Sequence, residues 1–222
     1  SSPLTASSVT ALGSSAFTSN SNTTLANMGS YGALSFTTNP SLKLTSATFR
    51  ANPTFTGANP IVISTLITTT NLTVPVNTTL TQDVTGTWNI GGVLTVGGNL
   101  TQDSFGTWNT TGDLIVQSGG VLTHNANTNT FARRLNITVG GALDVQAGGQ
   151  INVSSRGFSG GNGPNPGTAG GADGGAGGGH GGAGGVGGGA VAGGIVNDTF
   201  NTPANFGSGG GSGAGVGGMG GG

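Results

Sequence analysis

The chain lacks cysteine and glutamate and carries little charge of either sign. Without cysteine it can form no disulfide and no thiolate nucleophile or metal ligand, so stability must come from hydrogen bonds and packing. Charged residues make up 5% of the 222 positions, against about 25% in a typical soluble domain. This composition disfavours an ordinary cytosolic enzyme. The net charge is −1, with no basic cluster beyond Arg133–Arg134, so we expect no binding to nucleic acid.

Long hydrophobic runs are also missing. The longest candidate, Ile61–Ile67, has the length of a strand and falls far short of the roughly 20 residues of a membrane span, so none is expected. The chain begins with Ser-Ser-Pro, has no hydrophobic signal peptide and finishes in a glycine run. We therefore expect a processed or excised part of a longer protein.

Composition divides the chain into three regions. Residues 1–60 are rich in Ser, Thr, Asn and Ala and contain three Asn-Pro pairs, which predicts an extended β segment and a candidate subunit-joining strand. Residues 61–156 alternate β-branched and polar residues between glycine pairs, which predicts many short strands. Either Ala33–Thr37 or Ile61–Ile67 can serve as a strand donated to a neighbouring subunit. Glycine dominates residues 157–222.

The middle region contains an internal repeat. Leu-Thr-Gln-Asp at 80–83, followed by Gly-Thr-Trp-Asn at 86–89, recurs at 100–103 and 106–109. A second marker resembling Leu-Thr-Val begins at Leu72, Leu94, Leu114 and Ile137, so its intervals in the numbering are 22, 20 and 23. Short strands with glycine corners at this period predict an all-β fold, a β-solenoid in which each coil pairs with its neighbours.

The solenoid predicts a ladder of inward side chains in equivalent positions of successive coils. Trp88 and Trp108 share one phase, so their rings should stack. The complete set expected in the ladder is Trp88, Trp108, Leu94, Leu114 and Ile137. An aromatic pair of this kind adds about 0.5 to 1.5 kcal/mol beyond its burial.

The glycine-rich region has its own period. Non-glycine residues after Asp173 fall mostly at every third position, which is the period of a polyproline II helix. Bare glycine faces would allow extended helices to pack closely, as in polyglycine II. The alternative is a flexible linker, although Val186, Val191 and Ile195 argue against it.

No catalytic or cofactor motif is apparent. The phosphate-loop pattern is absent, and His124 and His180 lie in different regions, so we expect no enzyme and no cofactor. Asp83 and Asp103 occupy equivalent repeat positions and can either hold a cation between coils or accept backbone N–H groups at corners. The second role is the simpler one, and no metal site is assigned.

Asn-x-Ser/Thr sequons are numerous. Candidate N-glycosylation sites are Asn22, Asn71, Asn77, Asn99, Asn109, Asn136, Asn152 and Asn197. Asn77 and Asn99 each lie at the fifth position after the start of a repeat marker, while Asn71 and Asn136 directly precede one. Glycans at fixed phases would solvate a surface that lacks charge. The alternative is an Asn or Thr ladder that joins coil to coil.

Several glycine-pair segments resemble repeats of large secreted microbial adhesins, of the filamentous-haemagglutinin and autotransporter-passenger kind. These segments are Gly91–Val96, Gly119–Thr123, Gly140–Val145 and Gly148–Val153. The resemblance covers residues 70–155 and implies a surface-exposed β-solenoid stalk without catalysis. Residues 174–189 resemble the polyglycine II bundles in receptor-binding tips of some tailed phages. No functional residue is carried over from either.

These observations favour a structural subunit of an extracellular filament, sheath or surface fibre. Its partners would be copies of itself, joined through strand edges and glycine-rich segments. The alternative is an adhesin or phage-type receptor-binding fibre protein that recognises a glycan or a cell-surface receptor. Ice binding is a minor alternative, because flat solenoid faces can carry Thr arrays. All three functions place the chain outside the cell or on its surface.

Overall fold

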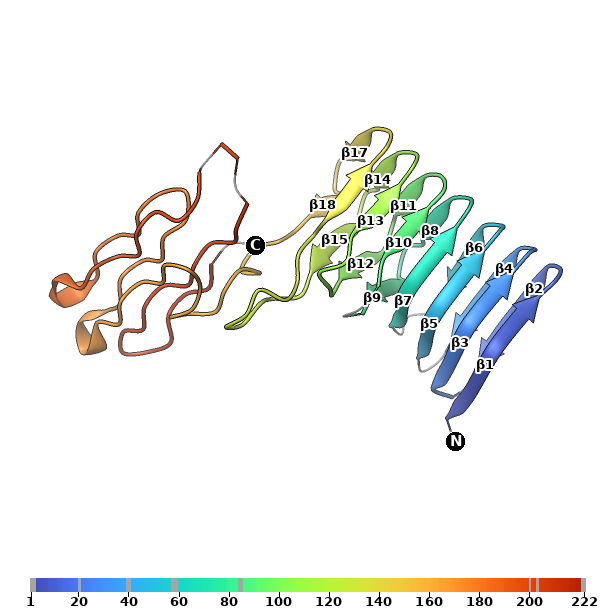
Figure 1. Ribbon diagram of the computed structural model, residues 1–222, viewed down its shortest axis with the longest axis horizontal. Helices are drawn as coiled ribbons and strands as arrows, with labels where there is room; N and C mark the ends of the chain where they lie inside the picture. The colour runs from blue at the N-terminus through green and yellow to red at the C-terminus, as the bar shows by residue number, and fades with distance from the viewer. Residues whose placement is uncertain are drawn as a thin grey trace. The chain divides into compact units, whose positions relative to one another are not determined.

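The computed structural model describes residues 3–19, 21–38, 41–56, 60–83, 86–199, 201–202 and 204–220. The chain forms two compact units, one of residues 1–123 and 134–152, the other of residues 124–133 and 153–222. The first unit is a parallel β-solenoid of about 6 turns, as the sequence predicts (Figure 1). Within the described residues no helix is both long and apolar enough to cross a membrane.

The solenoid strands form three parallel sheets along its sides. The largest has the order β1 (Leu4–Ala11), β3 (Thr23–Ser30), β5 (Leu42–Phe49), β7 (Ile61–Thr68), β9 (Thr79–Gln82), β12 (Asn99–Gln102), β15 (Val121–His124) and β18 (Gln150–Ile151). Branching from β7 are β10 (Trp88–Ile90), β13 (Trp108–Thr110) and β16 (Ile137–Val139). The second sheet contains β8 (Leu72–Val74), β11 (Leu94–Val96), β14 (Leu114–Val116) and β17 (Leu143–Val145), and the third β2 (Ser15–Ser19), β4 (Leu34–Thr38) and β6 (Pro53–Thr56).

The solenoid begins earlier than the sequence analysis placed it. Leu4 pairs with Thr23, Thr23 with Leu42, and Leu42 with Ile61, so these first coils are equal in length. The described strands of residues 1–60 therefore belong to the stack instead of forming a separate extended segment. The donor strands predicted at Ala33–Thr37 and Ile61–Ile67 are wrong, because β4 and β7 are each paired on both edges.

Coil length increases toward the other end of the solenoid. Leu94 pairs with Leu114, and Leu114 pairs with Leu143, so the last of these coils is longer than the one before it. The predicted ladder is therefore wrong at Ile137, which pairs with Trp108 in a different sheet. The cause is the extra segment 124–133, which leaves the solenoid and belongs to the second unit.

Alternation along the strands places apolar side chains inside the coils. In the first coils, Phe36 stacks on Phe55 with 5.2 Å between ring centroids, and Phe49 meets both rings edge-on. Farther along, Trp88 and Trp108 stack with centroids 4.8 Å apart and planes 12° apart. All five rings are fully buried. Stacked coils thus place like residues face to face, which explains why the Trp motif repeats.

The repeated Leu-Thr-Gln-Asp motif builds a buried polar network beside the tryptophans. The side-chain amide of Gln82 donates to the Gly86 carbonyl (2.8 Å), and its Oε1 accepts from Ser104 Oγ (2.7 Å) and Trp108 Nε1 (2.6 Å). In the next coil, Gln102 donates in the same way to its own glycine carbonyl, at position 106. Each Gln therefore closes its own turn, and Gln82 also anchors the coil above.

The second unit consists of extended passes joined by backbone hydrogen bonds. Gly177 N–H donates to Gly185, Gly184 N–H to Gly194, and Gly194 N–H back to Gly177 (2.8, 2.8 and 2.9 Å). Three passes that bond pairwise in a closed triangle cannot lie in one flat sheet. Backbone angles of −67° and 137° at Val191 are those of polyproline II. Within the described residues, two short 3₁₀ turns, η1 (Gly171–Asp173) and η2 (Gly188–Ala190), interrupt this region.

Asn127 stabilises residues 124–133, the part of the second unit that runs from the end of β15 toward β16 in the sequence. Its Oδ1 accepts from the N–H groups of Ala132 and Arg133, both at 2.8 Å. Its Nδ2 donates to the carbonyls of Arg133 and Arg156. Nearby, Phe131 meets Phe206 edge-on at 4.5 Å. A single buried amide therefore ties residues 124–133 to the start of the glycine-rich chain.

We predict that Gly184→Ala destabilises the second unit and that Gly185→Ala does not. A methyl group on Gly184 would overlap the Gly177 carbonyl oxygen, whereas one on Gly185 meets nothing within 4 Å. Hydrogen exchange of the backbone amides measures the effect: protection of residues 174–197 should fall only in the Gly184 variant. Equal protection in the two variants would contradict the close packing.

We also predict that Gln82→Leu costs more stability than Gln102→Leu. The first change leaves the Trp108 indole N–H, the Ser104 hydroxyl and the Gly86 carbonyl without their bonds, at about 1 to 3 kcal/mol for each group left buried and unpaired. The second removes two bonds, to the Gly106 carbonyl and from the Asn136 N–H. Urea unfolding followed by tryptophan fluorescence measures both, and the reverse order would refute the network.

Candidate functional site

The first strand of the solenoid presents an unprotected edge. β1 pairs with β3 in register from Leu4 to Ala11, and no described strand pairs with its other edge. Leu4 N–H donates to the Asn22 carbonyl at 2.9 Å. Since successive residues of a strand direct their N–H groups to opposite edges, the N–H groups of Thr5 and Ser7 lie on the unpaired side.

Strand β1 carries neither a charged residue nor a proline, although Ser8, with a φ of 62°, interrupts its extended backbone. Natural edge strands are commonly blocked by charged residues or proline, but β1 reads Leu-Thr-Ala-Ser-Ser-Val-Thr-Ala. Leu4 is 46% exposed, and Leu12, directly after the strand, is 80% exposed. The inward residues Ala6 and Val9 are only partly buried against the core. The end coil therefore offers both backbone groups and apolar surface.

The last coil of the solenoid is exposed in a similar way. Leu143 and Val145 of β17 are 55% and 43% exposed, although their paired neighbours Leu114 and Val116 are buried. Ile151 of β18 is also exposed, and β18 and β17 each lack a described strand on their outer edge. Within the solenoid unit, therefore, no described strand covers either the first or the last coil.

The strand pairing gives different repeat positions to sequons that the sequence markers predict to be equivalent. Asn99 pairs with Thr79, so Asn77, in the turn before β9, is out of phase with it. The reason is that the turn containing Asn77 is longer than the turn after β11. Asn71 precedes β8 and Asn136 precedes β16, which belong to different sheets. The shared phases inferred from the markers are therefore wrong for both pairs.

Several sequon side chains hold the solenoid together. Asn109 Nδ2 donates to Asn89 Oδ1 (2.9 Å), and Asn136 Nδ2 donates to Thr107 Oγ1 (2.9 Å). Asn71 Oδ1 accepts from the Val93 N–H at 2.8 Å. A glycan on Asn109 or Asn136 would leave one hydrogen on the Nδ2 atom and would have to emerge directly beside the side chain that accepts from it. These side chains fit the coil-to-coil ladder better than they fit glycosylation.

The remaining sequons differ in exposure. Asn77, Asn99 and Asn152 are exposed, and Asn22 Oδ1 accepts from Ser41 Oγ (3.0 Å). In the second unit, both amide atoms of Asn197 are buried without a hydrogen-bond partner among the described residues. Glycosylation thus stays a prediction that best fits the exposed residues, Asn77 and Asn99 above all.

The acidic residues do not gather into a catalytic or metal centre. Asp83 Oδ2 accepts from Lys43 Nζ at 2.6 Å, in an ion pair that bridges β5 and the end of β9. Asp103 lies one coil further along, where its N–H donates to the Gln82 carbonyl. No group of three His, Cys, Asp or Glu side chains that could hold a metal occurs among the described residues.

Asp198 organises a loop in the second unit. Its carboxylate accepts from the N–H groups of Asn205 (2.6 Å), Ala204 (2.7 Å) and Thr199 (2.8 Å). These bonds, chiefly that from Asn205, hold the pKa of Asp198 below its usual value, because they favour the charged form. Three backbone N–H groups therefore hold the carboxylate, and the nearby His180 contributes further to its lowered pKa.

We predict that this loop opens in acid. Because the pKa of Asp198 is lowered by folding, its stabilising contribution is complete above the ordinary carboxyl pKa of about 4 and is lost as the pH falls through the lowered value. The amide resonances of Ala204 and Asn205 should shift together with that midpoint in an NMR titration. In Asp198→Asn the same resonances should lose this pH dependence; an unchanged titration would disprove the assignment.

Comparison of the chain with models of protein families, with curated proteins and with solved structures finds no match in any of the three. The resemblance to secreted adhesin repeats therefore extends to the β-solenoid fold and to no identified family.

Proposed function

We propose that the chain is a structural subunit of an extracellular filament, sheath or surface fibre that joins copies of itself end to end. The observation that carries this proposal is the unprotected edge of β1, with unpaired N–H groups and exposed Leu4 and Leu12 beside it. An open strand edge is a template for adding a further strand. The last coil, with exposed Leu143 and Val145, provides the complementary end.

Head-to-tail addition follows from the parallel arrangement. The paired strands of the solenoid run parallel, so its two ends are different surfaces. Two identical ends cannot join by parallel strand pairing, whereas the first coil of one copy and the last coil of another can. A contact between two different surfaces, repeated without closure, generates an open filament. One copy's last coil on the next copy's first coil would continue the ladder and cover the apolar residues at both ends.

The low charge supports close association between copies. Only 5% of the residues are charged, and net charge is what normally keeps soluble proteins apart. On the described first coil, residues 3–19, there is no charged side chain to repel an approaching copy. An extracellular location agrees with this surface and with the exposed sequons Asn77 and Asn99.

We predict concentration-dependent filaments that Thr5→Pro shortens. Proline would remove the Thr5 N–H on the open edge and leave the Leu4 bond to Asn22 in place, as proline is tolerated where the N–H faces solvent. Assembly should then require about tenfold more protein, equivalent to about 1.4 kcal/mol per contact. Negative-stain microscopy and light scattering over a dilution series measure this.

Thr5→Val is the matched control, because it changes the same side chain and keeps the N–H. It should assemble as the unmodified chain does, and circular dichroism should show the same β content for all three proteins. Monodisperse particles at every concentration would refute self-assembly. Equal assembly of the Pro and Val variants would refute the β1 edge as the joining surface.

Ice binding receives less support from the outward side chains. One outward row runs through Thr5, Thr24, Lys43, Val62 and Thr81 in successive paired strands. A flat threonine array would need threonine at every step, and Lys43 projects from this row to bind Asp83. The interrupted row favours a stalk or filament over an ice-binding face.

A further inference from the structure

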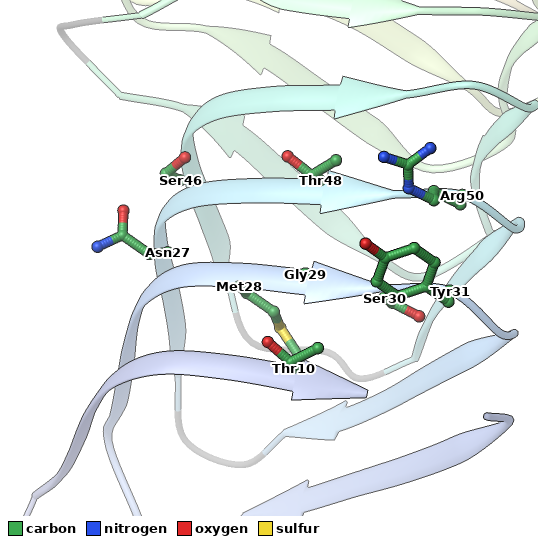
Figure 2. Close-up of a pocket in the computed structure, with 9 residues that line it drawn as sticks. All are labelled: Thr10, Asn27, Met28, Gly29, Ser30, Tyr31, Ser46, Thr48 and Arg50. Carbon is green, nitrogen blue, oxygen red and sulfur yellow. The ribbon is translucent and has the colours of Figure 1, made fainter. Parts of the chain in front are cut away.

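A hollow of about 310 Å³ lies on the outer face of the first three coils. Figure 2 shows Thr10, Gly29 and Thr48 across its middle, on β1, β3 and β5. Asn27 and Ser46 stand toward one end of these strands, and Tyr31 and Arg50 toward the other; Met28 and Ser30 complete the lining. The hollow belongs entirely to the solenoid unit.

The depression exists because Gly29 interrupts an outward row of threonines. Gly29 pairs with Thr10 on one side and Thr48 on the other, so two hydroxyl-bearing side chains flank a position without a side chain. A methyl group built on Gly29 meets nothing within 4 Å. Close packing therefore does not require glycine here, and its effect is to leave space between Thr10 and Thr48.

An aromatic ring and a cation lie together at one end of the hollow. The backbone N–H of Tyr31 donates to the Ala11 carbonyl and that of Arg50 to the Ser30 carbonyl, both at 2.9 Å. The Arg50 guanidinium lies 5.0 Å from the centroid of the Tyr31 ring. The ladder therefore holds the backbones of both residues, and the guanidinium lies over the aromatic ring.

Arg50 is available to a ligand. Its side chain makes no hydrogen bond or ion pair with any described residue, whereas Lys43, on the preceding strand β5, is neutralised by Asp83. No acidic residue lines the hollow. A guanidinium whose N–H groups are unused is well suited to a two-point contact with a carboxylate.

We propose that this hollow binds one ring of an acidic polysaccharide, with Arg50 pairing with the sugar carboxylate. The hydroxyls of Thr10, Ser46 and Thr48 and the Asn27 amide supply the donors and acceptors that sugar hydroxyls need. The volume is at the lower end of the range for small-molecule sites, which suits a single pyranose. The hollow is open at the surface, so the polymer can continue on either side.

This site adds a ligand to the proposed structural role and does not depend on it. A stalk with such a hollow on each subunit would hold many weak contacts to one polysaccharide, and linked sites of this kind bind far more tightly together than singly. The edge of β1 and the outward face of β1, β3 and β5 are different surfaces. Binding and assembly can therefore be tested separately.

The experiment measures binding of oligogalacturonate to the full chain by calorimetry, with a neutral oligosaccharide of equal length for comparison. Arg50→Gln removes the cation, and Gly29→Thr fills the hollow with a β-branched residue that suits a strand. We expect each variant to lose at least about tenfold in affinity for the acidic oligomer. Arg50→Lys should bind at an intermediate level, because it keeps the charge and loses the planar fork.

Lys43→Gln is the charge-matched control and should bind as the unmodified chain does. Equal binding of acidic and neutral oligomers would overturn the role of Arg50, and unchanged affinity of Gly29→Thr would overturn the location. The same measurement with dextran sulfate distinguishes binding of a carboxylate from binding of a sulfate group. Exclusive binding of the sulfated polymer would refute the carboxylate assignment. Gly29→Thr should leave filament length unchanged, so loss of binding with intact filaments separates this site from the joining edge.

Discussion

The parallel backbone ladder between coils is the interaction on which the solenoid depends. Each coil is too short to bury its own apolar residues, and the chain has no disulfide to stabilise it. Stacking satisfies the backbone groups and places like side chains in contact, so that Phe36 meets Phe55 and Trp88 meets Trp108. Inward positions are buried along the stack, and several of them, such as Thr23 and Ser30, are polar. Outward rows are free to change from coil to coil.

This division explains which parts of the fold could be predicted from the sequence. In residues 61–156 the inward Gln and Trp need particular partners one coil away, so a recognisable motif repeats. In residues 1–60 the positions equivalent to Gln82 are Ala6, Leu25 and Leu44, which share only an apolar, inward-facing character. A coil repeat in which equivalent positions share only hydrophobicity leaves no recognisable motif in the sequence. The insertion at 124–133 shifted the phase and led to the wrong place for Ile137.

The candidate sites were harder to predict, because both arise from relations between coils. β1 differs from β3 and β5 chiefly in having no described neighbour on one side, and its sequence, uncharged like that of β3, does not mark it as an edge. The hollow depends on Gly29 lying between Thr10 and Thr48, and on Tyr31 lying beside Arg50. These residues are a full coil apart along the chain, and only the register brings them together.

The two units also resist force differently. When two strands of a sheet are pulled apart from one end, their hydrogen bonds break one after another. In the glycine-rich unit, Gly177, Gly184 and Gly194 bond in a closed triangle, so no pass can leave without breaking bonds to two neighbours at once. The glycines of this bundle therefore let three passes bond pairwise, where side chains would keep their backbones apart.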